Sequence, residues 1–118
     1  EESPLEGVSR LIKGIGEVQK AVPEIAVVST GYSWLRHFAA YAGAGALENG
    51  WAKIVGFGRE AFAYPDFAKD ILENGNLSKE KCCIACGKCS EIMRAGGTPG
   101  CVIRDAAVYA PIYKKYCK

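Results

Sequence analysis

The sequence lacks the features that usually assign a chain to a membrane, to a nucleic-acid complex or to a repeat fold. No apolar run reaches the length of a membrane span, and no internal repeat or low-complexity segment is present. The formal net charge of +2 is too small to indicate a nucleic-acid or membrane surface. The single histidine, His37, is interpreted as a structural or capping residue rather than as a ligand or an acid.

A secretory leader pattern is also missing, because the opening residues EESPLEGVSR are acidic and polar. We therefore expect a cytoplasmic location, where thiols stay reduced and clustered cysteines bind metal more often than they form disulfides. The length of 118 residues, with 49% hydrophobic and 24% charged residues, is typical of one modest globular domain.

Hydrophobic periodicity predicts alternating helices and strands in the first part of the chain. Apolar residues at three- and four-residue spacing predict helices, and short β-branched runs predict strands buried on both faces of a parallel sheet. The helices are expected over about residues 5–22, 35–49 and 66–75, and the strands over about 25–29 and 52–56. This order predicts an α/β fold over residues 1–75. Regular patterning fades after Gly75, so residues 76–118 are expected to form a cysteine-rich loop and a C-terminal tail.

Five of the six cysteines lie between Lys81 and Cys101. Cys83, Cys86 and Cys89 follow the spacing Cys-x2-Cys-x2-Cys, and Cys101 comes later in the chain. Three thiolates at this spacing wrap one corner of a [4Fe–4S] cube, and a distant fourth completes the ligand set. Zinc prefers two separated pairs of ligands, so it is the weaker alternative, together with unliganded thiols or disulfides.

Cys82 and Cys117 stand outside this pattern and are interpreted as spare thiols. Adjacent side chains diverge, so Cys82 and Cys83 are not expected to bind one metal together, and the even spacing selects Cys83. Small and apolar neighbours are expected to admit backbone amides to the sulfurs and to exclude water; they are Ala85, Gly87, Gly96, Gly97, Gly100, Ile84, Ile92, Met93 and Ile103.

Each predicted strand ends in a glycine turn, STGY after the first and GFGRE after the second. Glycine lets backbone N–H groups approach a phosphate, and arginine adds a bidentate positive charge. Gly31, Gly58 and Arg59 supply these parts, although glycine after a strand often serves only as a turn. Glu60 and Arg104 are expected to be solvated.

The combination VVSTGY…IVGFGREAFAYPD…CCIACGKC…GC resembles the C-terminal end of the old yellow enzyme-like NADH:flavin oxidoreductases. It is most similar to the iron–sulfur branch that includes 2,4-dienoyl-CoA reductase and trimethylamine dehydrogenase. The resemblance implies the last two βα units of a TIM (β/α)8 barrel that binds FMN. It assigns Gly31, Tyr32, Gly58 and Arg59 to the FMN phosphate, and Cys83, Cys86, Cys89 and Cys101 to the cluster near the flavin.

The sequence departs from this family at Tyr32, which replaces the second glycine of its turn, and in length. A whole barrel needs roughly 200 residues or more, so strands one to six and any catalytic residues on them have no counterpart here. We expect the missing N-terminal barrel portion or another subunit to complete the sheet. The favoured hypothesis is that this chain is a fragment of a longer protein.

The resemblance implies a flavin-dependent oxidoreductase that uses NAD(P)H and an enoyl-type or related electron-poor substrate, with the isolated chain inactive. Two alternatives remain. One is a non-enzymatic electron-transfer module with a single cluster, and the other is a zinc-stabilised structural or interaction domain.

Overall fold

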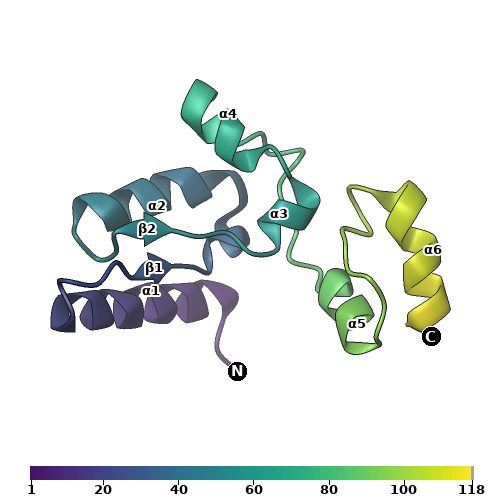
Figure 1. Ribbon diagram of the computed structural model, residues 1–118, viewed down its shortest axis with the longest axis horizontal. Helices are drawn as coiled ribbons and strands as arrows, with labels where there is room; N and C mark the ends of the chain where they lie inside the picture. The colour runs from purple at the N-terminus through teal and green to yellow at the C-terminus, as the bar shows by residue number, and fades with distance from the viewer. Residues whose placement is uncertain (118) are drawn as a thin grey trace.

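The structure, a computed structural model, describes residues 1–117. It consists of helices around two short parallel strands (Figure 1). In chain order the elements are α1 (Pro4–Ala21), β1 (Val28–Ser29), η1 (Tyr32–Phe38), α2 (Ala39–Glu48), β2 (Ile54–Val55), α3 (Glu60–Ala63), α4 (Phe67–Asn74), α5 (Lys88–Arg94) and α6 (Ala106–Tyr116). Within residues 1–117, every helix is too short or too polar to cross a bilayer.

Local sequence explains where α1 begins. The Glu6 N–H donates to Ser3 Oγ at 3.3 Å, and the Ser3 N–H donates to Glu6 Oε2 at 2.9 Å. This reciprocal capping box, with Pro4 in the first turn, satisfies amides that would otherwise lack a partner at the helix start. Helix α1 then lies along β1, and α2 lies along β2 (Figure 1).

The two strands are shorter than the sequence predicts, and they are not buried on both faces. Val28 pairs with Ile54 and Ser29 with Val55 in parallel register. Ser29 is buried and Val55 packs against Gly43 of α2, whereas Val28 is 45% exposed and Ile54 is 49% exposed. In the described part of the chain, therefore, the face of the strands that carries Val28 and Ile54 has no cover.

The turn after β1 divides the single helix that the sequence predicts over residues 35–49. Gly31 adopts a φ of +98°, and the buried Tyr32 hydroxyl lies 2.6 Å from Ser29 Oγ. Arg36 has φ 51° and ψ −124°, which no helix allows. The segment therefore forms the 3-10 helix η1 with a kink at Arg36, followed by α2.

The core lies between α2, the turn after β1 and the segment that follows α4. Its buried members are Tyr32, Ala39, Ala46, Tyr64, Leu77 and Cys82. The Tyr64 hydroxyl donates to Asp70 of α4 and accepts from the Ser78 N–H. Gly75 ends α4 in the left-handed conformation, at φ 74°. These contacts anchor the beginning of the cysteine-rich segment to the core.

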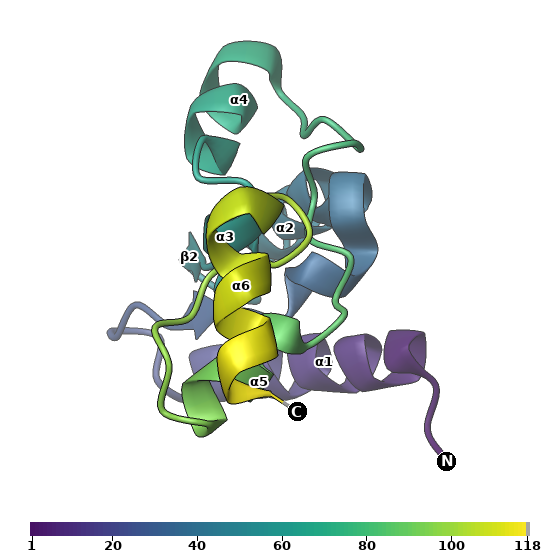
Figure 2. The ribbon, with the colours of Figure 1, turned by 90° about the vertical axis from the view of Figure 1, so that its right-hand side faces the viewer.

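The C-terminal segment is more ordered than the fading sequence pattern predicts, because it forms α5 and α6. The two helices pack beside each other at one end of the molecule (Figures 1 and 2). Gly97 lies against Ile92 and Tyr116, and Gly100 lies against the ring of Tyr109. Close approach at these glycines lets the connection between the helices fold back on α6.

Candidate functional site

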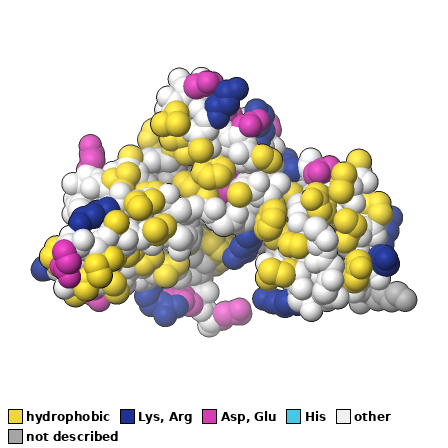
Figure 3. Space-filling model, viewed as in Figure 1, with side chains coloured by type: hydrophobic (Ala, Val, Ile, Leu, Met, Phe, Trp, Pro, Cys, Tyr) yellow, Lys and Arg dark blue, Asp and Glu magenta, His cyan; other side chains and the backbone are white. Residues whose placement is uncertain are grey.

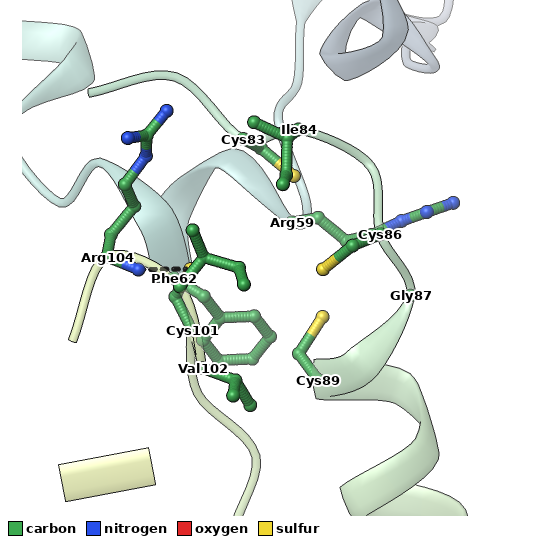
Figure 4. Close-up of a pocket in the computed structure, with 11 residues that line it drawn as sticks. Arg59, Phe62, Cys83, Ile84, Cys86, Gly87, Cys89, Cys101, Val102 and Arg104 are labelled. Carbon is green, nitrogen blue, oxygen red and sulfur yellow. Dashed lines mark hydrogen bonds between the residues drawn. The ribbon is translucent and has the colours of Figure 1, made fainter. Parts of the chain in front are cut away.

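Four cysteines line one small cavity between the core and the C-terminal helices. Cys83 and Cys86 belong to the loop before α5, Cys89 lies in the first turn of α5, and Cys101 lies in the connection to α6. The cavity is partly open to solvent, and its volume is about 20 Å³ when counted as the space open to the centre of a water-sized sphere. Figure 4 shows the sulfur atoms of Cys86 and Cys89 facing each other across this space.

Two residues in left-handed conformation bend the loop around the cavity. Ala85 has φ 56°, and Gly87 has φ 79° at the position that precedes α5. A left-handed backbone is strained for alanine but not for glycine. These bends bring Cys83, Cys86 and Cys89 to one cavity, where an extended chain would spread them apart.

Backbone amides point at two of the four sulfurs. The Ala85 N–H donates to Cys83 Sγ at 3.3 Å, and the Arg104 N–H donates to Cys101 Sγ at 3.2 Å. Hydrogen bonds of this kind stabilise negative charge on sulfur and tune cluster potentials. Apolar side chains complete the cavity wall; they are Phe62, Ile84, Val102 and Ile103.

Several residues that the sequence predicts to surround the cysteine sulfurs lie away from the cavity. Ile92 is buried against Gly97, and Met93 is 59% exposed. Neither residue belongs to the cavity wall, nor do Gly97 and Gly100, which pack against the tyrosines of α6. The expectation that these four residues surround the sulfurs therefore does not agree with the lining of the cavity.

The sulfurs are not gathered closely enough for a single metal ion. Within residues 1–117, no three His, Cys, Asp or Glu side chains form a group that could hold one. All six cysteines are free thiols. Among the described residues, the four cysteines therefore line one cavity without forming a site for a single metal ion.

Adjacent Cys82 and Cys83 have different surroundings. Cys82 is completely buried in the core, and its thiol donates to the Ser78 carbonyl at 3.3 Å. Burial, reinforced by the charge of Glu60, raises the pKa of Cys82 to about 11. Cys83 lines the cavity, and burial raises its pKa as well, while the Ala85 N–H opposes that shift. Cys117, at the end of α6, does not line the cavity.

Glu60 is the residue that sequence reasoning misplaced, since it is completely buried rather than solvated. Its Oε1 accepts a hydrogen bond of 3.1 Å from the Cys83 N–H, while Oε2 has no hydrogen-bond partner among the described residues. Burial raises the pKa of this carboxyl, and the Cys83 N–H partly opposes the shift. Glu60 follows Gly58–Arg59 directly, but nothing in its sequence context separates it from a surface glutamate.

Arg104 is exposed, as expected, but its guanidinium is held by hydrogen bonds to the backbone. Its Nε and Nη2 donate to the Cys82 carbonyl at 3.2 and 3.0 Å. Bidentate arginine contacts of this kind fix orientation as well as position. Arg104 therefore ties the segment that follows Cys101 to the segment that contains Cys82 and Cys83.

The residues assigned to a phosphate are only partly brought together. Gly31 and Arg59 line one pocket beside the start of α1, and Arg59 also borders the cysteine cavity. In Figure 4 the Arg59 guanidinium extends past Cys86 and away from the sulfurs. The Tyr32 side chain is buried in the core, and Gly58 belongs to neither pocket wall, although a Cβ there would meet open space.

The start of α1 adds acidic groups to this second pocket. Glu2 lines the pocket and forms an ion pair with Arg10, with Nη2 and Oε2 2.6 Å apart. Among the described residues that line this pocket, Arg59 is the one with a positive charge. The chain matches no protein-family model, no curated protein and no solved structure. A functional assignment therefore depends on the geometry of these two neighbouring pockets.

Proposed function

We propose that this chain is the C-terminal segment of an FMN- and [4Fe–4S]-dependent NAD(P)H:flavin oxidoreductase of the old yellow enzyme type. In this proposal it contributes the cluster ligands and part of the FMN-phosphate site. The observation that carries the proposal is the convergence of Cys83, Cys86, Cys89 and Cys101 on one cavity. Three of them follow the Cys-x2-Cys-x2-Cys spacing, and the fourth comes from a separate segment.

The chemistry of the cavity suits an iron–sulfur cube. Each cysteine would bind a different iron, so the sulfurs need to surround a space rather than meet at one point. Amides directed at Cys83 Sγ and Cys101 Sγ would offset part of the negative charge on the thiolates. The apolar wall would limit access of water.

Zinc is a poorer explanation of the same four thiols. A Zn–S bond of about 2.3 Å places four sulfurs within roughly 4 Å of one another. In the described residues no such group of ligands is assembled. The spacing of the cysteines in sequence also lacks the two separated pairs that zinc sites favour.

The adjoining pocket supports a phosphate-binding role for Gly31 and Arg59. Gly31 follows the end of β1, and Arg59 follows the end of β2, so both lie beyond the carboxyl ends of parallel strands. Phosphate sites of α/β barrels form in loops at this end of the strands. Because Arg59 borders both pockets, an FMN phosphate held there would place the cofactor next to the cysteine cavity.

The uncovered face of the strands supports a larger barrel. Val28 and Ile54 are opposite each other, exposed and β-branched, as expected of side chains that face a barrel interior. Hydrophobic side chains are numerous on the face shown in Figure 3, over α1, α2 and the strands. The proposed N-terminal barrel portion, or another subunit, would cover this face and pair with the strand edges.

Bound FMN and cluster would supply hydride transfer and single-electron transfer. The residues of this chain would bind and orient these groups. Arg59 would hold the phosphate, the four cysteines would hold the cluster, and the cavity wall would keep water away. Residues that select an electron-poor substrate would lie on the part of the barrel outside this chain.

Anaerobic purification of the full-length protein tests the proposal. Iron, acid-labile sulfide and flavin are measured per chain, together with the optical spectrum. Flavin peaks over a broad iron–sulfur band are expected. A broad band without flavin would instead support the one-cluster electron-transfer module, and a colourless protein with one zinc per chain would support the structural domain. Either result would overturn the oxidoreductase assignment.

A further inference from the structure

Charged side chains hold the peptide group between Cys82 and Cys83 from both sides. Its N–H, on Cys83, donates to Glu60 Oε1 at 3.1 Å. Its carbonyl, on Cys82, accepts from Arg104 Nε and Nη2 at 3.2 and 3.0 Å. Because the N–H and C=O belong to one planar unit, these three contacts together fix the rotation of that unit.

The two thiols on either side of this peptide point to different places. Cys82 lies in the core with its thiol on the Ser78 carbonyl, and Cys83 lines the cavity. Successive side chains of an extended segment point to opposite faces. A shift of the segment that brought Cys82 toward the cavity would therefore carry Cys83 away from it.

We propose that Glu60 and Arg104 act together as positioning residues that select Cys83, rather than Cys82, as a cluster ligand. The inference rests on the proposed iron–sulfur site. The even spacing favours Cys83, but Cys82 is chemically identical and only one residue away, so the fold needs a physical means of keeping Cys82 out of the cavity. The clamp formed by Glu60 and Arg104 provides that means.

Arg104 extends the clamp across the cavity. Its backbone N–H donates to Cys101 Sγ at 3.2 Å, while its guanidinium holds the Cys82 carbonyl. One residue therefore positions Cys83 through the peptide and Cys101 through its own amide. The buried Glu60 carboxylate faces the same peptide from α3, so the clamp joins three segments that are far apart in sequence.

Alkylation of the cluster-free full-length protein tests the clamp without any cofactor. Iodoacetamide labelling under native conditions is followed at Cys82 and Cys83 by fragmentation mass spectrometry. Arg104→Met and Glu60→Ala are expected to raise the rate at Cys82 at least about fivefold, since each removes hydrogen bonds to a charged group. Burial and the charge of Glu60 raise the Cys82 pKa. Glu60→Gln keeps an acceptor of the same shape but also removes that charge, and it is expected to have a smaller effect than Glu60→Ala. Equal effects of the two variants would reflect the thiol pKa and would count against the clamp.

Exposed residues of the same type supply matched controls. Arg94→Met and Glu73→Gln remove charges from α5 and α4 and are expected to leave the Cys82 rate within about twofold of wild type, as surface changes usually do. Far-ultraviolet circular dichroism reports whether a variant has lost its fold as a whole.

Iron analysis tests the choice of ligand. Wild type and Cys82→Ser are expected to hold about four irons per chain, and Cys83→Ser about three or fewer. Adding Arg104→Met to Cys83→Ser is expected to restore iron, because the freed peptide lets Cys82 replace the missing ligand. The restored cluster would show an altered electron paramagnetic resonance spectrum.

The outcomes separate the clamp from the proposed function. Iron in wild type with unchanged Cys82 labelling in Arg104→Met and Glu60→Ala overturns the clamp alone. Loss of the cluster in Cys82→Ser but not in Cys83→Ser overturns the ligand choice. Wild type without iron after anaerobic purification overturns the proposed function, and the ligand choice with it.

Discussion

Gly100 is the position where one added methyl group should disturb the site most directly. An ideal Cβ at Gly100 would lie 2.1 Å from Tyr109 Cζ and 2.2 and 2.4 Å from two neighbouring ring carbons. Ordinary contact begins at about 3.4 Å, so the ring would have to retreat by about 1.3 Å. The clashing ring carbons lie at the end of the Tyr109 side chain, so the ring must swing out of its present rotamer or α6 must shift away from the Cys101 segment.

The cost of Gly100→Ala follows from this overlap. Overpacking of this kind destabilises by about 1–3 kcal/mol, and a tenfold change corresponds to about 1.4 kcal/mol. Amide hydrogen exchange in α6 should therefore accelerate by about 5- to 140-fold in the cluster-free protein. Because Gly100 precedes Cys101, iron retention should fall as well.

Gly45→Ala is the matched control, because a Cβ at Gly45 meets nothing within 4 Å and the residue lies inside α2. Alanine there should be neutral or stabilising by up to about 1 kcal/mol. Tyr109→Ala should relieve the overlap, so the double variant with Gly100→Ala should lose less stability than the two single effects predict together. Wild-type exchange rates in Gly100→Ala would refute the packing argument.

Three further predictions concern the turn after β1, the buried thiol and the uncovered sheet face. Gly31→Ala should destabilise the folded state by about 1–3 kcal/mol, as measured by urea unfolding. The reason is that φ is +98° and that a Cβ would lie 2.7 Å from Leu11 Cδ2. Full rescue by Leu11→Ala would show that backbone strain has no part in the loss. Cys82 has a pKa of about 11 in the folded state against 9.0 for an ordinary thiol. The folded state therefore holds the proton more tightly, and this contribution is fully present below about pH 9 and is lost as pH rises toward 11. Urea unfolding of the cluster-free protein should accordingly weaken over that range by on the order of 2–3 kcal/mol from Cys82. Cys82→Ser should make the dependence shallower, and the remainder comes from Cys83 and Tyr64, whose pKa values burial also raises. An equally steep loss in the variant would refute the assignment to Cys82. Lysine at both Val28 and Ile54 should lower the melting temperature of the full-length protein if a barrel covers this face, whereas the isolated chain should change little because both residues are half exposed; equal effects in the two would contradict the barrel.

Local sequence determined the parts of the structure that depend on near neighbours. Ser3 and Glu6 are three residues apart, so the capping box that begins α1 is visible in the sequence. Glycine is the residue best suited to a turn, as at Gly31 and Gly75, and both adopt positive φ in the structure. The spacing of Cys83, Cys86 and Cys89 likewise suffices for a loop that brings the three residues to one cavity.

Contacts between distant segments decided the rest. The burial of Glu60 depends on an amide 23 residues away, and the contact between Arg104 and Cys82 spans 22 residues. Neither contact produces a periodic pattern in the sequence, so the sequence does not distinguish Glu60 and Arg104 from charged surface residues. The same holds for the burial of the strands. The pattern of Val28 and Ile54 indicates burial, but only the arrangement of neighbouring elements determines whether that face of the strands is covered. Short-range rules fix a residue's conformation, but its solvent exposure and its partners arise only when remote parts of the chain pack together.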